Sequence, residues 1–258
     1  MTDISPSGDT PADAGAAVEV PLTGGRLTHG VVQVGETVRR PVSASSPFVA
    51  QLLRHLEQHG FAGAPRYLGV DEAGRDIFSY LPGTVPAKFQ QWTDAQVGAA
   101  GVLLRRLHDG TRGSTLAGRF PVVCHHDPGP NNTVFLKDVP AAFIDFDTAA
   151  PGEPLEDVGY AAWTWTISAR PDRGPVDVQA AQVRLLADAY GLDRHERQRL
   201  VAAILERQSR NARFWADRAR SPSEPGPGMD VIQARVEWSR REHAFVCAHR
   251  AAFESVLG

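Results

Sequence analysis

The sequence predicts an α+β protein with a small, strand-rich N-terminal lobe and a larger, mainly helical C-terminal lobe. Short runs with strand character fill the segment up to Leu81, whereas apolar residues recur at helical spacing in most of the chain after it. The Pro82-Gly83 step between the two parts is a typical break in regular structure. A chain of 258 residues, 42% of them hydrophobic, can build the core that such a fold needs.

The expected N-terminal lobe spans residues 18–81 and contains four strand-like runs. They are bounded by turn residues and comprise Val18–Leu22, Gly30–Val34, Thr37–Arg40 and Arg75–Leu81. The Gly35-Glu36 step between the second and third runs predicts a tight antiparallel hairpin. One helix interrupts the strands. We expect it to begin at Ser46-Pro47, because Ser caps helices and Pro suits the first turn, and to end at Gly60.

The expected C-terminal lobe spans residues 82–258. Four of its segments have helical periodicity, namely Thr93–His108, Val183–Tyr190, His195–Arg218 and Met229–Val256. The stretch from Val122 to Asp147 has few helix signals and is predicted to form loops and a hairpin. Trp163 and Trp165 lie on a further predicted helix. Since residues two apart occupy different faces of a helix, we expect only one of them to face inward.

Residues 1–17 differ from the rest of the chain in composition. They are rich in Ser, Pro, Gly, Asp and Ala and have almost no large apolar side chains. Such a segment cannot bury enough surface to offset the entropy of ordering, so we expect a disordered leader.

No apolar stretch reaches the length of a membrane span, and the N-terminus lacks a signal pattern. We therefore expect a cytoplasmic protein without a membrane partner.

The balance of charges narrows the class of partner. The chain has 27 Lys and Arg residues against 30 Asp and Glu residues, a formal net charge of −3. No surplus of positive charge exists to neutralise a nucleic-acid strand, whereas a mildly acidic protein suits a cationic small molecule.

The two cysteines, Cys124 and Cys247, form no disulfide framework. Cys124 lies in an apolar run, so a buried, reduced thiol is expected.

Residues 125–132, which we call the catalytic loop, carry the most informative motif. They read His-His-Asp-Pro-Gly-Pro-Asn-Asn and fit the pattern H-x-D-x-x-x-x-N, and an Ile-Asp-Phe step follows at 144–146. Phosphoryl transfer from a nucleotide needs a carboxylate that accepts the proton of the attacking hydroxyl, and oxygen ligands for magnesium. Asp127 fits the role of catalytic base. Asn132 and Asp145 fit the role of magnesium ligands.

The residues after the loop are expected to bring these parts together. Apolar residues at 134–136 and 143–144 are predicted to pair as two short strands, which returns Asp145 to the catalytic loop. His125 is expected to make a structural hydrogen bond that supports the loop. Asp147 is expected to be an accessory carboxylate rather than a primary metal ligand.

Three segments resemble the aminoglycoside phosphotransferase family, which is related to choline kinases and, more distantly, to protein kinases. They are the catalytic loop, the Ile-Asp-Phe-Asp step at 144–147 and the run Glu-Asp-Val-Gly-Tyr-Ala-Ala-Trp at 156–163. The likeness covers nearly all of the chain after the leader and is strongest from Val122 to Trp163. It implies a two-lobed, protein-kinase-like fold with a small antiparallel sheet. It also implies a phosphotransferase that uses ATP or GTP with Mg²⁺ and phosphorylates a hydroxyl of a small molecule, such as an aminoglycoside-like antibiotic.

The resemblance also implies roles for residues outside the catalytic loop. Asp157 would lie at the start of a helix beneath the loop and hold its backbone N–H groups. Backbone groups of Ser79, Tyr80 and Leu81 would bind the purine ring. Acidic side chains would meet amines of a cationic acceptor, and the candidates in this sequence are Glu153, Asp172, Asp177, Glu237 and Glu242.

The nucleotide side departs from the family pattern. Kinases of this type carry a lysine on the third strand and a glutamate that pairs with it on the next helix. Here the third strand reads Thr-Val-Arg-Arg-Pro at 37–41, and the helix offers no inward glutamate in its first turns. We assign Arg39 to the nucleotide phosphates, with Arg40 as the alternative, because a guanidinium binds phosphate in a bidentate way. The Gly24-Gly25 step fits either a phosphate-binding turn or a plain turn.

Two other functions fit parts of the sequence. The missing lysine and glutamate fit a catalytically weak, kinase-like protein that binds a ligand or acts as a scaffold. A metal-dependent hydrolase would instead use His125, His126, Asp127 and Asp145 as ligands. That reaction leaves Asn132 without a role, so the phosphotransferase is preferred.

Overall fold

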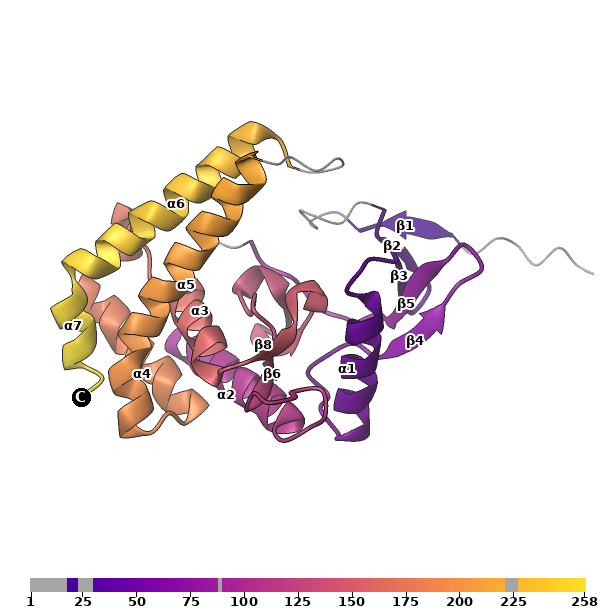
Figure 1. The fold of residues 1–258 in the computed structure, drawn as a ribbon, viewed down its shortest axis with the longest axis horizontal. Coiled ribbons are helices and arrows are strands. Elements are labelled where there is room, and N and C mark those ends of the chain that lie inside the picture. Colours follow the sequence, from indigo (N-terminus) through magenta and orange to yellow (C-terminus); the bar gives the residue numbers. More distant parts are fainter. Residues whose placement is uncertain (1–17, 23–29, 88–89, 221–226) are drawn as a thin grey trace, which may run out of the picture.

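The computed structural model describes residues 18–22, 30–87, 90–220 and 227–258. It has two lobes. One is a five-stranded antiparallel sheet with one helix, and the other is a larger helical part that contains two short two-stranded sheets (Figure 1). The predicted two-lobed α+β fold is confirmed, while the predicted boundaries at 17 and 81 stay predictions. The predicted leader and the Gly24-Gly25 step lie outside the described residues. Within the described part, no helix is both long and apolar enough to span a membrane.

The N-terminal sheet has the strand order β1-β2-β3-β5-β4, and each neighbouring pair is antiparallel. The strands are β1 (Glu19–Pro21), β2 (Val32–Val34), β3 (Thr37–Pro41), β4 (Tyr67–Val70) and β5 (Arg75–Ser79). Helix α1 (Ser46–Gln58) follows β3, with Pro47 in its first turn as the sequence predicts. The expected cap at Ser46 is wrong, because Ser45 is the N-cap without a side-chain capping bond and the hydroxyl of Ser46 donates to Asp76 instead. Its buried apolar residues recur at helical spacing and are Val49, Leu52, Leu53 and Leu56.

Strand β4 has no counterpart in the sequence-based prediction. Gly69 lies at its centre with φ +126°, and the register shifts between Tyr67 and Gly69. A four-residue run that contains a glycine and a bulge gives no regular alternation of apolar and polar residues. Its pairing with β5, which joins Val70 to Asp76, is a tertiary contact that local sequence does not reveal.

The C-terminal lobe begins with α2 (Asp94–Thr111), which Thr93 caps in a capping box with Gln96. Two antiparallel strand pairs follow. They are β6 (Val122–Cys124) with β9 (Ala150–Gly152), and β7 (Thr133–Leu136) with β8 (Val139–Phe143). The short 3₁₀ turns are η1 (Pro130–Asn132), η2 (Phe146–Thr148) and η3 (Pro171–Arg173). The remaining helices are α3 (Pro154–Thr166), α4 (Val176–Tyr190), α5 (Arg194–Arg220), α6 (Met229–Ala248) and α7 (Arg250–Ser255).

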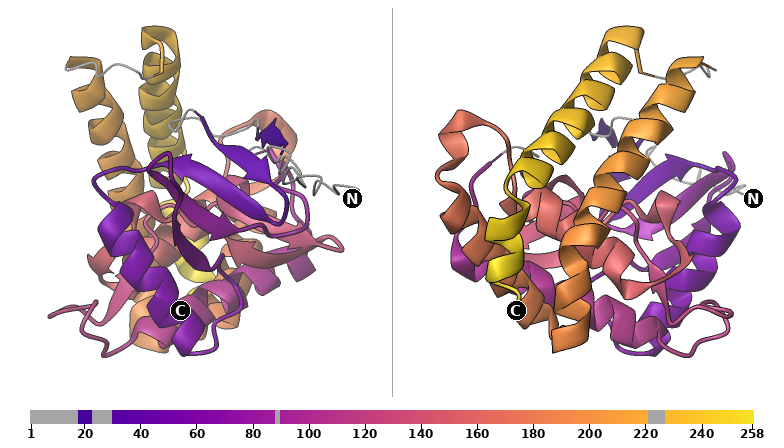
Figure 2. Two further views of the ribbon diagram at one scale, coloured as in Figure 1. Left: turned by 90° about the vertical axis from the view of Figure 1, so that its right-hand side faces the viewer. Right: turned by 60° about the vertical axis from the view of Figure 1, so that its left-hand side comes forward.

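The last predicted helix, Met229–Val256, is divided in the structure. Helix α6 ends at Ala248, and α7 begins at Arg250 after a break at His249. The backbone N–H of His249 donates to the carbonyl oxygens of Phe245 and Cys247, which closes the final turn of α6. Helices α5 and α6 lie side by side as a long helical hairpin (Figure 2).

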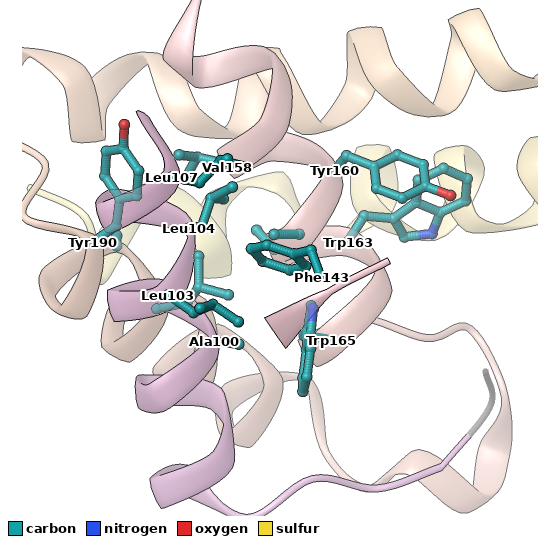
Figure 3. Close-up of a cluster of buried hydrophobic side chains, with 14 of the residues drawn as sticks. Ala100, Leu103, Leu104, Leu107, Phe143, Val158, Tyr160, Trp163, Trp165 and Tyr190 are labelled. Atoms are coloured by element: carbon teal, nitrogen blue, oxygen red, sulfur yellow. The ribbon is translucent and has the colours of Figure 1, made fainter. Parts of the chain in front are cut away.

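Helix α3 lies at the centre of the C-terminal lobe, and it corrects one expectation. Trp163 and Trp165 are both fully buried, although only one was expected to face inward. Helices α2, α4 and α5 contact α3 from several directions, so a side chain on any of these faces reaches a core. Trp163 stacks on Trp238 of α6 with ring centroids 4.3 Å apart, and Trp165 packs on Trp92 at 5.3 Å. Trp163 also packs edge-to-face on Tyr160 with ring centroids 5.6 Å apart, and Figure 3 shows the two indoles pointing in different directions from α3.

Two glycines of α2 provide a test of how closely α2 packs against α4. A Cβ atom at Gly101 would lie 2.9 Å from the backbone oxygen of Leu186 in α4, whereas a Cβ at Gly98 meets nothing within 4 Å. We expect Gly101→Ala to lower the free energy of unfolding by about 1–3 kcal/mol through overpacking. Gly98→Ala is the matched control and should raise it by up to about 1 kcal/mol through helix propensity. Urea unfolding of both variants measures this, and equal effects would contradict the close α2–α4 contact.

Candidate active site

Strand pairing brings the two ends of the motif together. Thr133 on β7 pairs with Phe143 on β8, and the N–H of Ile144 donates to the carbonyl oxygen of Asn132 at 2.9 Å. Asp145 is the next residue, so it returns beside the end of the catalytic loop. The pairing agrees with the two short strands that the sequence predicts here.

Asp157, in the first turn of α3, holds the start of the catalytic loop. Its carboxylate is fully buried and accepts the backbone N–H groups of His125 at 2.6 Å and His126 at 2.7 Å. Its Oδ2 atom also contacts Nε2 of His108 at 3.1 Å. Burial alone would raise the pKa of Asp157, but the hydrogen bond and charge of His108, with His126 and His125 nearby, lower this pKa to about 2.

His125 links the catalytic loop to the strand that ends at Asp145. Its Nε2 lies 3.0 Å from the carbonyl oxygen of Ile144, and its Nδ1 accepts the N–H of Asp127 at 3.3 Å. This geometry fits the tautomer that carries its proton on Nε2. The backbone oxygen of His125 accepts from the hydroxyl of Thr148 at 2.8 Å. The side chain expected to support the loop therefore contacts both halves of the motif.

Three side chains to which the sequence analysis assigns no role at the catalytic loop also fix this loop. Arg207 of α5 donates to the carbonyl oxygen of His126 at 2.7 Å, and Nε1 of Trp165 donates to that of Pro128 at 3.0 Å. His108 of α2 holds Asp157. All three come from helices far from the loop in sequence, and two are buried polar groups whose partners only the tertiary structure shows.

Asp127 and Asn132 are joined inside the loop. The Nδ2 of Asn132 donates to Oδ2 of Asp127 at 2.8 Å and to its backbone oxygen at 3.0 Å. The Oδ1 of Asn132 accepts from Nδ2 of Asn131 at 2.9 Å. In the part of the chain that the structure describes, Oδ1 of Asp127 is buried and has no hydrogen-bond partner. One carboxylate oxygen is thus held in place, and the other is left for a donor that is not part of the chain.

Asp145 has an unusual backbone conformation, φ 62° and ψ 63°, in the left-handed region. Its side chain is about 50% exposed and lies 3.7 Å from the guanidinium of Arg40. Partial removal from water, followed by the nearby carboxylate of Asp147, raises the pKa of Asp145, while His125 and Arg40 oppose this. A bound divalent cation would favour the ionised form of such a carboxylate.

The structure turns the two arginines of β3 to opposite faces of the sheet, as strand geometry requires. Arg39 contacts Asp71 at 3.6 Å and the hydroxyl of Thr37 at 2.8 Å, away from the catalytic loop. Arg40 is buried and lies 2.5 Å from Asp147 in addition to its contact with Asp145. The structure therefore brings Arg40 to the site, whereas Arg39, the residue that the sequence analysis assigns to the phosphates, contacts Asp71.

Asp147 anchors Arg40 in place of the missing helix glutamate. Its Oδ1 also accepts a hydrogen bond from the hydroxyl of Ser45, just before α1, at 3.3 Å. Glu57, the glutamate near the far end of α1, instead contacts Arg66 at 3.8 Å. The Asp-Phe-Asp sequence at 145–147 is the feature that could have indicated this role of Asp147. The η2 turn places the side chains of both Asp145 and Asp147 beside Arg40.

The linker between the lobes offers few free backbone donors. The N–H of Ser79 donates to Arg66 at 2.9 Å, and the N–H of Tyr80 donates to Glu36 at 2.8 Å. Within the described residues, only Leu81 of the three linker residues retains an N–H without a backbone partner. A purine bound here would have to use that donor or the carbonyl oxygens.

The histidines of the loop do not form a metal site. Within the described ranges, the one set of His, Cys and acidic groups close enough to share an ion is His108, Cys124 and Asp157. Both nitrogens of His108 are already engaged, with Tyr190 at 2.7 Å and with Asp157. Burial raises the pKa of the Cys124 thiol, which keeps it protonated. Within the described residues, the four side chains that the hydrolase alternative needs, His125, His126, Asp127 and Asp145, are not gathered closely enough to share one ion.

Several acidic candidates for an acceptor amine have other partners. Asp172 pairs with Arg170 at 2.7 Å, and Glu153 forms the N-terminal capping box of α3 with Glu156. Glu242 is buried, which raises its pKa, and it accepts the N–H of Ala169 at 3.0 Å. These three side chains therefore already have partners within the described residues, and the roles of Asp177 and Glu237 stay predictions.

The Asp157 carboxylate makes a prediction about stability. Asp157→Asn should lower the free energy of unfolding by about 3 kcal/mol, because an amide cannot accept two N–H groups and His108 with both of its terminal atoms. Glu237→Gln, an exposed change of the same kind on α6, is the control and should have little effect.

The same carboxylate predicts a pH dependence. The folded pKa of Asp157 lies below the ordinary value of 3.8 for an aspartate, so the stability that this carboxylate contributes is present above about pH 4 and is lost as pH falls toward 2. About 1 kcal/mol should be lost by pH 3. The difference between wild type and Asp157→Asn in urea unfolding should therefore narrow from pH 5 to pH 3, and a constant difference would contradict this account.

Comparison with known proteins adds to this geometry. The model of the phosphotransferase enzyme family matches residues 112–200. Trifolitoxin immunity protein of Rhizobium leguminosarum bv. trifolii is 31% identical over 261 residues, which covers 93% of this chain and 98% of that protein.

Solved structures show the same fold. A choline/ethanolamine kinase family protein from Mesorhizobium loti superposes with a TM-score of 0.60 at 17% identity, covering 95% of this chain and 94% of the other. The streptomycin–ATP–APH(2")-IIa ternary complex gives a TM-score of 0.53 at 14% identity, covering 87% and 93%. The near full-length relative, together with the family-model match, shows that the chain belongs to the aminoglycoside phosphotransferase family.

Proposed function

We propose that the protein transfers the γ-phosphoryl group of ATP or GTP to a hydroxyl of a small molecule, with Asp127 as the base. The observation that carries the proposal is the state of the Asp127 carboxylate. Asn132 holds Oδ2 at 2.8 Å, while Oδ1 is buried and has no partner within the described residues. A group that must orient a hydroxyl and then take its proton needs one fixed and one free oxygen.

In this reaction Asp127 accepts a hydrogen bond from the hydroxyl of the acceptor. The oxygen of that hydroxyl forms a bond to the γ-phosphorus as the bond to the β-phosphate oxygen breaks, and the nucleoside diphosphate leaves. The hydroxyl proton passes to Asp127. Asn132 keeps the carboxylate oriented throughout, and Asp157 and Arg207 keep the loop backbone from moving.

Asn132 and Asp145 fit the role of magnesium ligands. Both offer oxygen atoms, which Mg²⁺ prefers, and the Ile144–Asn132 hydrogen bond keeps them adjacent. The half-exposed carboxylate of Asp145 remains open to a cation. When bound, Mg²⁺ would neutralise charge on the β- and γ-phosphate oxygens.

Arg40 is proposed to contact the nucleotide phosphates in place of the family's lysine. It is buried beside Asp145, and its Nε has no hydrogen-bond partner in the described part of the chain. A buried guanidinium with an unused donor fits the oxygen atoms of a phosphate. The backbone of Leu81 is proposed to meet the purine.

The relative suggests a class of acceptor. A protein named for immunity to trifolitoxin is similar to this chain over nearly its whole length. A toxic small molecule that carries a hydroxyl is therefore proposed as the acceptor, and an aminoglycoside-like antibiotic is one such molecule. The second candidate is a catalytically weak binding protein, which the missing lysine and helix glutamate favour.

The role of Asp127 predicts a large loss of activity on substitution. Asp127→Asn should lower magnesium-dependent nucleotide turnover by roughly 10²–10⁴-fold, since it removes the proton acceptor and leaves the shape of the loop. Turnover would be measured across a panel of hydroxyl-bearing acceptors. Asp138→Asn, in the exposed turn between β7 and β8, is the control. Turnover that survives Asp127→Asn would contradict the mechanism, and nucleotide binding without turnover in the wild type would favour the binding protein.

The two arginines of β3 form a matched pair for the nucleotide side. Arg40→Gln should weaken magnesium–nucleotide binding by roughly 10–100-fold, the value of a charge-assisted hydrogen bond. Arg39→Gln should change it by less than about threefold, since Arg39 points to Asp71. Calorimetric titration measures both, and Arg40→Lys tests whether charge alone suffices. Equal losses from both glutamine variants would show that Arg40 has no special contact with the nucleotide.

A further inference from the structure

A groove of about 280 Å³ lies between α5 and α6. Ala212 and Ala216 of α5 line it, and their small side chains leave the space open. Arg207, which contacts the catalytic loop, lies on a different face of α5, because a helix turns by about 100° per residue. The groove is therefore separate from Asp127. Figure 2 shows the two helices side by side.

Gln208 lines this groove and is fully buried. Neither its Nε2 nor its Oε1 has a hydrogen-bond partner within the described residues. A buried amide with both atoms unpaired is rare, because each atom loses its water without gaining a partner. The groove is also much larger than the roughly 10–15 Å³ of cavity volume that one water molecule needs. A ligand with hydrogen-bonding groups would satisfy this side chain.

The charges around the groove specify the kind of ligand. Its lining includes Arg213, Arg240 and His243, and none of the eight lining residues is acidic. Arg240 has no ion pair within the described ranges, and Arg213 has a single long contact with Glu206 at 3.7 Å. The nearby Glu242 is turned away and accepts the N–H of Ala169. Two guanidinium groups without close acidic partners favour an oxyanion.

We propose that this groove binds a small molecule that carries a phosphate or carboxylate group. The oxyanion lies between Arg213 and Arg240, and a polar group of the same molecule bonds to Gln208. The site is independent of the proposed phosphoryl transfer, since none of these three residues belongs to the Asp127 site.

The side-chain amide of Gln208 provides a local probe. In ¹H–¹⁵N spectra its NH₂ signals are identified by their loss in Gln208→Leu, and sequential assignment identifies them independently if that variant does not fold. Wild-type protein is titrated with sodium phosphate and, separately, with sodium acetate, with sodium chloride keeping the ionic strength constant. A saturable shift of the Gln208 signals is expected with at least one of the two anions, and the arm that responds tells phosphate from carboxylate.

Matched variants locate the binding. Arg240→Gln should weaken the binding at least fivefold, whereas Arg199→Gln, an exposed change of equal charge earlier in α5, should leave it within twofold. Arg40→Gln should also leave the Gln208 titration unchanged. The proposal is overturned if neither anion gives a saturable shift, if Arg240→Gln binds as well as wild type, or if Arg40→Gln abolishes the shift.

Discussion

The geometry of the catalytic loop depends on the buried carboxylate of Asp157. Two consecutive N–H groups, those of His125 and His126, point at it, so the backbone must turn sharply at this place, and His126 takes a φ of 63°. Asp127 follows directly after this turn, where Asn132 holds one oxygen of its carboxylate. Because the carboxylate is charged in a fully buried place, His108 is needed beside it. The helices α2 and α3 thus determine where the proposed base lies.

A second constraint joins the two lobes. Arg40 belongs to the N-terminal sheet, while Asp145 and Asp147 follow β8 of the C-terminal lobe, and their contacts span 2.5–3.7 Å. Ser45, at the start of α1, adds a hydrogen bond to the same Asp147. A kinase of the usual type anchors its lysine within the N-terminal lobe. Here the cation is anchored by the opposite lobe, so the position of Arg40 depends on how the lobes meet.

The long elements of the fold could be predicted because their apolar residues repeat at helical spacing. Helices α1, α2 and α5 are examples, and Pro47 in addition marks the first turn of α1. Strand β4 and the break at His249 could not, because they depend on a partner strand and on packing at the chain end. The two buried tryptophans of α3 show where the expectation of a single buried helix face fails. Only a helix at the surface has one buried face, whereas α3 has other helices on several sides.

The spacing of residues in the sequence predicts those site residues that lie in one continuous segment. It does not predict the residues that come from distant helices. Asp127, Asn132 and Asp145 are close in sequence, so a motif and one hairpin bring them together. Arg207 and Trp165 reach the loop from distant helices, and no local pattern marks them. The choice between the β3 arginines is an intermediate case. Val38 packs against the core, and strand alternation places Arg40, not Arg39, on that same side. The choice of Arg40 over Arg39 could therefore have been predicted from the sequence, once Val38 is assigned to the face of β3 that packs on the core.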